Sequence, residues 1–473
     1  MITPQSRPYI FYISWFTLIV SVLFTMWLQF YRLGELPIVQ WDESRLAVNA
    51  AEMYRSGKLL VSTYELKPDL YNTKPPLMIW LQSGSMRIFG VNEFAVRFPS
   101  AMAGFLSIML CGFIIYRQYR NLLLASVAIL ILACSNGFIQ LHGSMTGDYD
   151  SLLAFWLLAA FRMFYHGYIA GDDKDAQKWF SALLSLAVMT KSAAALVCFP
   201  VFIMATLPLA DYRKTLHATV YCLMSLIPFM IYCLAREQSA PGYLEAIQKN
   251  DFSGRFSRAL EGHTSEWHYY IVNLFDYRYH LMIWLLPPAL LLAIFLKDRF
   301  YRYYAFCLVG FLLFLSVAKT RIHWYDTPAL PMVAIVITSF LFFLYRQAHE
   351  LHWKIAFIVL LCITITVPIM EKYRFIAHRK DLKLDMSHYE LSDMLRMYDG
   401  QDSLKYIAYH YDAEFYFYTK ANPKVFRGRF TQLQPGDMVA YGNRFRDSMP
   451  MMYNYNLLDS TPNAWKVRIT GIK

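Results

Sequence analysis

The chain has 473 residues, of which 57% are hydrophobic, 17% are aromatic and only 17% are charged. Runs of about 18 or more apolar residues recur, so composition predicts an α-helical polytopic membrane protein rather than a soluble domain. The formal net charge is +11, but the basic residues are scattered through short loops and form no stripe with interleaved aromatic residues. This distribution argues against a nucleic-acid partner.

About eleven membrane-length stretches follow one another along the chain. With the N-terminus in the cytoplasm, most Lys and Arg residues between them fall in short inside loops, as the positive-inside rule requires. The first stretch has no small-residue cleavage site, so we interpret it as a retained helix rather than a signal peptide. The predicted spans are 9–30, 98–116, 121–140, 151–168, 178–190, 193–210, 216–234, 281–296, 303–318, 327–345 and 354–370.

This orientation leaves several regions on the outer side, namely 31–97, 141–150, 236–280, 319–326 and a soluble tail. A helical pattern over 387–397 and period-two patterns over 406–409 and 465–469 predict a small α/β domain in the tail. We therefore expect a transmembrane domain over 1–370 and an outer α/β domain over 371–473. The role of the outer domain is not readable from its sequence.

A charged cluster, Trp41-Asp42-Glu43-Ser44-Arg45, follows the first span and begins a predicted amphipathic helix over 42–55. In one interpretation Asp42 caps this helix and Glu43 favours its positive end. In the other, Asp42 faces an outer cavity as a general base, and Arg45 orients it or binds phosphate. The two interpretations are compatible.

A second acidic cluster, Thr146-Gly147-Asp148-Tyr149-Asp150, precedes the fourth predicted span. Gly147-Asp148 is typical of a turn, and two carboxylates alone are an incomplete ligand set for a divalent metal. We favour acids that hydrogen-bond sugar hydroxyls or hold a nearby base. No metal and no required cofactor are expected, and all seven cysteines lie in apolar spans without a metal-binding pattern.

Basic residues on the outer side supply the complementary charge. Lys74 precedes two prolines that keep the chain extended, so its ammonium has a fixed direction and does not move freely on a flexible surface. Lys191 interrupts two apolar segments, and Lys319 and Arg321 lie in a short outer turn. Each of them taken alone could be a snorkelling anchor. Cations from separate loops favour a convergent phosphate site.

These motifs, in the order WDESR, NTKPPL, TGDYDSLL, TKS and AKTRIHWYDTPALP, carry a resemblance to a known family. The chain resembles the GT-C class of membrane glycosyltransferases, in the branch that holds the protein O-mannosyltransferases and the lipid A aminoarabinose transferases. The resemblance covers residues 10 to 345. It implies a GT-C fold with amphipathic helices in the first outer loop.

The resemblance also implies roles for single residues. The catalytic residues would be Asp42, as the candidate base, Glu43 beside it, and Asp150, which matches the acid that opens the fourth span. The donor phosphate would be bound by Lys74, Arg255, Lys319, Arg45 and Tyr325, and the sugar or acceptor by Asp148, His263 and Lys191.

The implied activity is an inverting transfer of a sugar from a polyprenyl-phosphate donor to an acceptor at the outer face of a bacterial inner membrane. The acceptor would be an envelope glycolipid, a polysaccharide or a protein hydroxyl. Leu46, Thr73 and Ser192 depart from the residues typical of the aminoarabinose transferases, which leaves the sugar and the acceptor open. The alternative class is a transporter or flippase of a lipid-linked sugar, or a protein that only binds the lipid.

Overall fold

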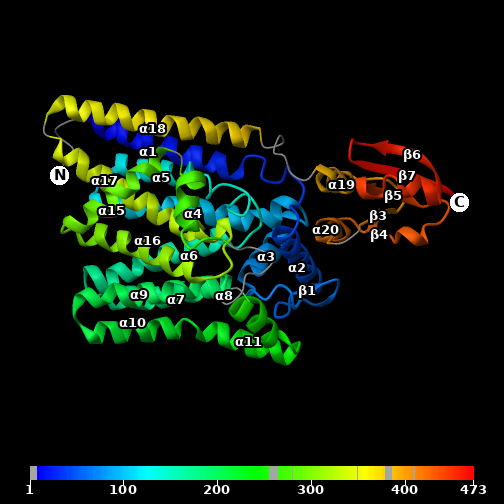
Figure 1. Cartoon of the computed structure of the whole chain (residues 1–473), viewed down its shortest axis with the longest axis horizontal. Coiled ribbons are helices and arrows are strands. Elements are labelled where there is room, and N and C mark those ends of the chain that lie inside the picture. The colour runs from blue at the N-terminus through cyan, green and yellow to red at the C-terminus, as the bar shows by residue number, and fades with distance from the viewer. Residues whose placement is uncertain (1–7, 255–264, 280, 349, 379–385, 409–410) are drawn as a thin grey trace.

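The computed structural model describes residues 8–254, 265–279, 281–348, 350–378, 386–408 and 411–473. Long helices run side by side through the larger part of the molecule, and a small sheet with two helices lies beyond one end of this bundle (Figure 1). The predicted fold class, a helical membrane protein with a small C-terminal α/β unit, is confirmed.

Among the described residues, seven helical segments are long and apolar enough to cross a membrane. They are Phe11–Phe30, Glu93–Tyr119, Asp150–Ala170, Ser192–Leu209, Tyr212–Ser239, Arg299–Val317 and His323–Gln347. Two shorter apolar helices, Leu122–Ala133 and Met282–Phe295, coincide with further predicted spans. The chain is therefore a multi-pass membrane protein.

The bundle is centred on α17, whose side chains from Leu330 to Leu341 are all buried. A helix that is apolar on every side is typical of a protein core or a membrane span, and the burial of α17 shows that other parts of the protein surround it. The helices of the bundle are α1 (Pro8–Phe30), α4 (Glu93–Tyr119), α5 (Leu122–Ala133), α6 (Asp150–Phe164), α7 (Lys174–Thr190), α8 (Ser192–Leu196), α9 (Cys198–Thr206), α10 (Tyr212–Met224), α11 (Ile227–Ser239), α15 (Leu286–Phe295), α16 (Arg299–Val317), α17 (Leu330–Gln347) and α18 (Leu351–Ala377).

The predicted span 121–140 is shorter than expected, because α5 ends at Ala133. The chain then forms a buried loop that returns to the outer end of the bundle. The Asn136 amide donates to the Arg278 carbonyl at 2.8 Å. A Cβ at Gly137 would clash with the Arg278 side chain, so a glycine here leaves room for this arginine in its present position. The loop carries residues of the candidate site.

Helix α2 (Asp42–Ser56) matches the amphipathic helix predicted over 42–55. It is followed by the short strands β1 (Thr63–Tyr64) and β2 (Lys67–Pro68) and by α3 (Leu77–Phe89). An amphipathic helix beside a membrane span can lie with its apolar side chains along the membrane surface. Leu46, Ala50 and Met53 are instead at most 2% exposed, because the protein itself covers this face.

The C-terminal unit contains a five-stranded sheet in the order β4-β3-β5-β7-β6. β3 is parallel to β4 and β5, whereas β7 is antiparallel to β5 and β6. The predicted helix and both predicted strands of this tail are present. The elements are α19 (Met386–Arg396), β3 (Leu404–Ile407), α20 (Ala413–Ala421), β4 (Val425–Arg427), β5 (Met438–Gly442), β6 (Tyr453–Ser460) and β7 (Ala464–Ile472).

The C-terminal unit packs directly on the first outer region. Ala47 and Val48 of α2 share a buried cluster with Phe415 and Tyr418 of α20. The hydroxyl of Tyr418 accepts from the Ile38 amide at 3.1 Å and donates to Glu93 at 3.0 Å. The division at residue 370 stays a prediction, and α18 runs across that position to Ala377.

Candidate functional site

The candidate site lies at the end of the bundle that carries α2, α3 and the C-terminal unit (Figure 1). Short elements meet there, among them the start of α2, the loop after α5, the start of α6, α8 and the 3-10 helix η6 (His323–Ala329). The predicted site residues of the described chain come from these elements or from the turns beside them.

A buried ion pair between Glu43 and Arg97 joins α2 to α4. Both side chains are at most 3% exposed, and Glu43 accepts from Arg97 Nε at 2.7 Å and from Nη2 at 2.9 Å. Glu43 also accepts from the amides of Val39 and Gly147, at 2.8 and 2.9 Å. Arg97 donates further to the carbonyls of Leu33, Leu36 and Pro37. The pair therefore ties three chain segments together behind the site.

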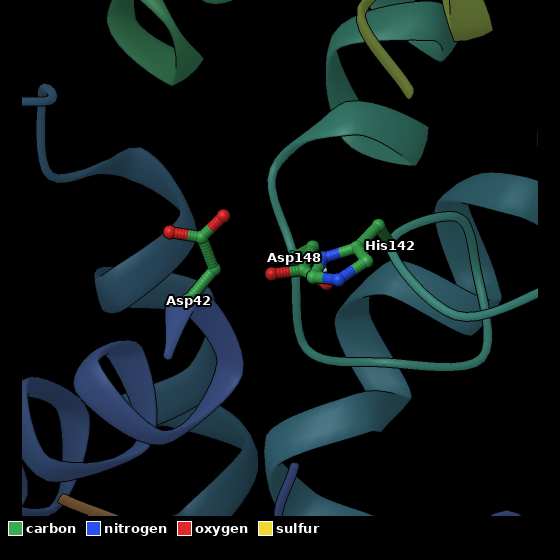
Figure 2. A group of neighbouring side chains, drawn as sticks. All are labelled: Asp42, His142 and Asp148. Atoms are coloured by element: carbon green, nitrogen blue, oxygen red, sulfur yellow. Dashed lines mark ion pairs between the residues drawn. The ribbon is translucent and has the colours of Figure 1, made fainter. Parts of the chain in front are cut away.

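Asp42 is the first residue of α2 and is partly exposed. The N-cap position is Trp41, and no side-chain cap bond is present there, so Asp42 does not cap the helix. Its carboxylate faces the loop after α5, where His142 and Asp148 lie (Figure 2). One ligand atom from each of these three residues lies within 4.8 Å of the other two.

His142 is held on three sides. Its ring stacks on Trp324 with 3.9 Å between ring centres, and its Nδ1 lies 3.3 Å from Oδ2 of Asp148. The amide of His142 donates to the Thr146 hydroxyl, which donates to Asp148 at 2.5 Å. The ring is therefore fixed between the aromatic face of Trp324 and the carboxylate of Asp148.

Burial and charge act in opposite directions on this pair. Burial alone lowers the pKa of His142, but the neighbouring carboxylate of Asp148, with those of Asp42 and Asp150, raises it above its usual range. Burial alone raises the pKa of Asp148, but His142, Thr146 and Lys191 lower it. Each group therefore favours the charged form of the other, against the cost of burial.

Asp42, His142 and Asp148 offer the oxygen and nitrogen ligands that suit a divalent transition metal. Oδ1 of Asp148 is buried without a hydrogen-bond partner among the described atoms. Their donor set therefore fits a divalent cation when the His142 imidazole is neutral. The expectation that no metal is required stays a prediction.

Beside this cluster lies a cavity with about 680 Å³ of empty space. Its walls are mostly apolar and come from α6, α8 and α16. A few polar side chains gather in the same lining. The apolar lining includes Leu153, Ala193, Ala194, Val197, Phe311 and Leu315, and the polar lining includes Lys74, Asp150, Lys191, Asp251, Thr320 and Tyr325. Such a cavity fits an amphiphilic ligand with an anionic group.

The two lysines of the cavity are held by different partners. Nζ of Lys191 lies 2.7 Å from Oδ1 of Asp150 and 4.6 Å from the ring centre of Tyr325. Nζ of Lys74 lies 5.6 Å from the ring centre of Tyr149, whose hydroxyl bonds to Asn72. Lys191 is thus a buried, paired charge rather than a membrane anchor.

Arg45 is occupied elsewhere. It makes a bidentate pair with Asp69, at 2.8 Å from Nε and 2.6 Å from Nη2, and its guanidinium lies 3.9 Å from the ring centre of Tyr64. Burial alone raises the pKa of Asp69, but Arg45, Asn49 and the Asn72 amide lower it. Arg45 therefore supports the loop that carries Lys74, and it is not among the described residues that line the cavity.

Three further predicted residues have no described contact in the site. Lys319 is exposed on its turn, beside Thr320 of the cavity lining. Arg255 and His263 lie outside the described residues. Their predicted roles stay predictions.

Sequence reasoning missed several residues that build the site. Arg97, Asp69 and Asp251 lie far along the chain from their partners, and no local pattern marks them. His142 could have been found from the sequence, because it is a titratable residue within the segment 141–150, which was predicted to lie on the outer side.

Comparison with known proteins gives one family and one fold. Residues 19–240 match the family described as dolichyl-phosphate-mannose-protein mannosyltransferase. The undecaprenyl phosphate-alpha-4-amino-4-deoxy-L-arabinose arabinosyl transferase 2 of Proteus mirabilis is 28% identical over 334 residues, which cover 68% of this chain and 59% of the relative. A transferase of the same description from Sodalis glossinidius is 29% identical, over 64% of this chain and 54% of the relative. The chain thus spans less than two thirds of the length of these relatives.

Solved structures share the fold over nearly the whole chain. ArnT from Cupriavidus metallidurans, bound to undecaprenyl phosphate, superimposes with a TM-score of 0.71 at 14% identity, over 95% of this chain and 97% of that one. The archaeal oligosaccharyltransferase AglB from Archaeoglobus fulgidus gives a TM-score of 0.54 at 11% identity, over 98% of this chain and 74% of that one. The predicted resemblance to the GT-C class, in its mannosyltransferase and aminoarabinose transferase branch, is confirmed.

Proposed function

We propose that this GT-C membrane protein is an inverting glycosyltransferase that moves a sugar from a polyprenyl-phosphate donor to an acceptor hydroxyl or phosphate. The observation that carries the proposal is the cavity whose apolar walls meet Lys74, Lys191 and Tyr325. Its chemistry suits a lipid that ends in a phosphate. The names of the related transferases, which include undecaprenyl phosphate, point to the same donor class.

The donor would bind with its prenyl chain along the apolar walls from α8 and α16. Its phosphate would lie against Lys74 and Lys191, and Lys319 and Arg255 are proposed as further contacts. Negative charge grows on this phosphate as the glycosidic bond breaks, so fixed cations stabilise the transition state more than the bound donor. A phosphate surrounded by cations leaves without protonation.

The acceptor would be activated by Asp42. Its carboxylate takes the proton of the acceptor hydroxyl while the acceptor oxygen forms a bond to the anomeric carbon. The bond from that carbon to the phosphate oxygen breaks on the opposite face, and its electron pair leaves with the lipid phosphate. Attack from the face opposite the leaving group inverts the anomeric centre.

The other acids receive supporting roles. Asp150 neutralises and orients Lys191, and Asp148 holds His142 beside Asp42. Glu43, predicted as a catalytic group, is proposed here as a positioning residue, because Arg97 and two amides occupy its carboxylate. We propose sugar or acceptor contacts for His142 and Asp148, and His263 is kept as a candidate from the long loop.

We propose that the chain lies in a bacterial inner membrane with this site on the periplasmic side. The acceptor would then be an envelope glycolipid or polysaccharide, with a protein hydroxyl as the alternative.

A transfer assay tests the proposal. Purified protein is mixed with radiolabelled undecaprenyl-phosphate sugars and envelope extract, and wild type is compared with Asp42→Asn. Label that moves to an acceptor in wild type and stays on the lipid in the variant would support the transferase. Label that never leaves the lipid but crosses a vesicle bilayer would contradict it and favour a transporter.

A further inference from the structure

The residue directly before the proposed base has an unusual backbone conformation. Trp41 has φ 73° and ψ −112°, in a region that residues with a Cβ rarely adopt. Such a conformation costs free energy and persists only where surrounding contacts impose it. Because the peptide after Trp41 leads straight into Asp42, this conformation sets the direction in which α2 and its first side chain begin.

Contacts from the C-terminal unit hold Trp41 in this conformation. The ring of Tyr411 stacks on the ring of Trp41 with 4.8 Å between centres and 12° between planes. The Tyr411 hydroxyl donates to the Trp41 carbonyl at 3.1 Å. The Ser44 hydroxyl and the Arg45 amide donate to the same carbonyl, at 2.9 and 3.0 Å. Three donors therefore fix the orientation of the peptide that joins Trp41 to Asp42.

The C-terminal unit is anchored firmly enough to impose this conformation. Helix α20, which begins two residues after Tyr411, bonds through Tyr418 to the Ile38 amide and to Glu93. Lys420 pairs with Glu52 at the far end of α2, at 3.5 Å. The C-terminal unit therefore contacts the chain both before Trp41, at Ile38, and after Asp42, at Glu52. Tyr411 makes its contact at Trp41, between these two points.

We propose that the C-terminal unit positions the catalytic base, with Tyr411 as the positioning residue that holds Trp41 and so directs Asp42 toward His142 and Asp148. The role of Asp42 as the base rests on the proposed function. The geometric part, in which Tyr411 orders the start of α2, does not depend on catalysis. The two parts are therefore tested by different measurements.

The first measurement is hydrogen exchange by mass spectrometry on the full chain in detergent. We expect Tyr411→Ala to raise exchange in the first turn of α2 at least tenfold, because the Trp41 carbonyl loses a donor and its ring loses its stacking partner. Tyr416→Phe is the matched control, since Tyr416 belongs to the same unit and bonds to Glu52 at 3.3 Å, away from Asp42. Equal exchange in wild type and Tyr411→Ala would overturn the proposal.

The second measurement is the kinetics of transfer. We expect Tyr411→Ala to lower kcat about 10- to 100-fold, the scale of a catalytic group misplaced by about 1 Å, with undecaprenyl-phosphate affinity within about twofold of wild type. Tyr411→Phe, which keeps the stacked ring, should recover much of this loss. A fall in donor affinity that matches the fall in kcat would mean general damage and would overturn the proposal.

A double variant tests whether the backbone of Trp41 is the link. Trp41→Gly adopts a positive φ without strain, so removing Tyr411 should cost much less activity in that background than in wild type. Equal losses in both backgrounds would overturn the positioning role. If wild type itself shows no transfer, the proposed function fails, and the exchange measurement still decides whether Tyr411 orders α2.

Discussion

Replacing Glu43 by glutamine distinguishes a positioning role from a catalytic one. The substitution keeps the shape of the side chain but leaves the buried guanidinium of Arg97 without its counter-charge. Breaking a buried ion pair on one side costs about 3–5 kcal/mol. With an unfolding entropy of about 2.1 cal/mol/K per residue, 473 residues give about 1 kcal/mol/K, so the thermal midpoint should fall by about 3–5 °C.

Two measurements are made in detergent. The first is the thermal unfolding midpoint, and the second is transfer activity at a temperature where both proteins are folded. The control is the double variant Glu43→Met/Arg97→Met, which removes both charges and should recover most of the midpoint. If Glu43→Gln keeps the wild-type midpoint and still loses all transfer, Glu43 acts in catalysis and the reasoning from its buried contacts is wrong.

Other predictions concern the charges around the cavity. The pKa of His142 is raised in the folded protein, so its pair with Asp148 stabilises the fold fully below pH about 6.5, and this stabilisation is lost as the pH rises through the raised pKa. Thermal midpoints measured between pH 5 and 9 should therefore fall with rising pH in wild type, and His142→Gln should remove this fall. A fall of the same size in the variant would contradict the pairing. Transfer should persist in EDTA, because lysines already neutralise the leaving phosphate; a loss restored by added zinc or manganese and absent in His142→Gln would instead show a metal at this cluster. Lys191→Met should weaken binding of undecaprenyl phosphate about 10- to 100-fold, the value of one charge-assisted contact, and unchanged affinity in a calorimetric titration would remove Lys191 from the donor site.

The sequence predicted the elements that depend on local pattern. Apolar runs located the spans, and the charged start of α2 was predicted to within a residue, because periodicity and capping are short-range properties. The end of α5 was missed, since Leu130 to Gln140 reads as one mostly apolar run. The loop after Ala133 contacts Arg278, a residue from a distant segment, whose carbonyl accepts from the Asn136 amide.

The same limit applies to the site. Lys74, Asp150 and Lys191 were recognised as functional candidates because charge is conspicuous in an apolar context. The role of each charged side chain depends on its ion-pair or hydrogen-bond partner, and these partners come from distant segments of the chain. Arg45 was predicted to bind phosphate, but Asp69 occupies its guanidinium. No pattern in the sequence brings these two residues together before the loop between α2 and α3 is folded.

The measurement that tests the proposed site most directly compares transfer with donor binding in two variants. We expect Asp42→Asn to lower kcat by about 10²- to 10⁴-fold, the usual value of a general base, and to bind undecaprenyl phosphate like wild type. We expect Lys74→Met to weaken that binding about 10- to 100-fold. Normal transfer by Asp42→Asn, or equal damage to donor binding in both variants, would contradict the assignment of base and phosphate site.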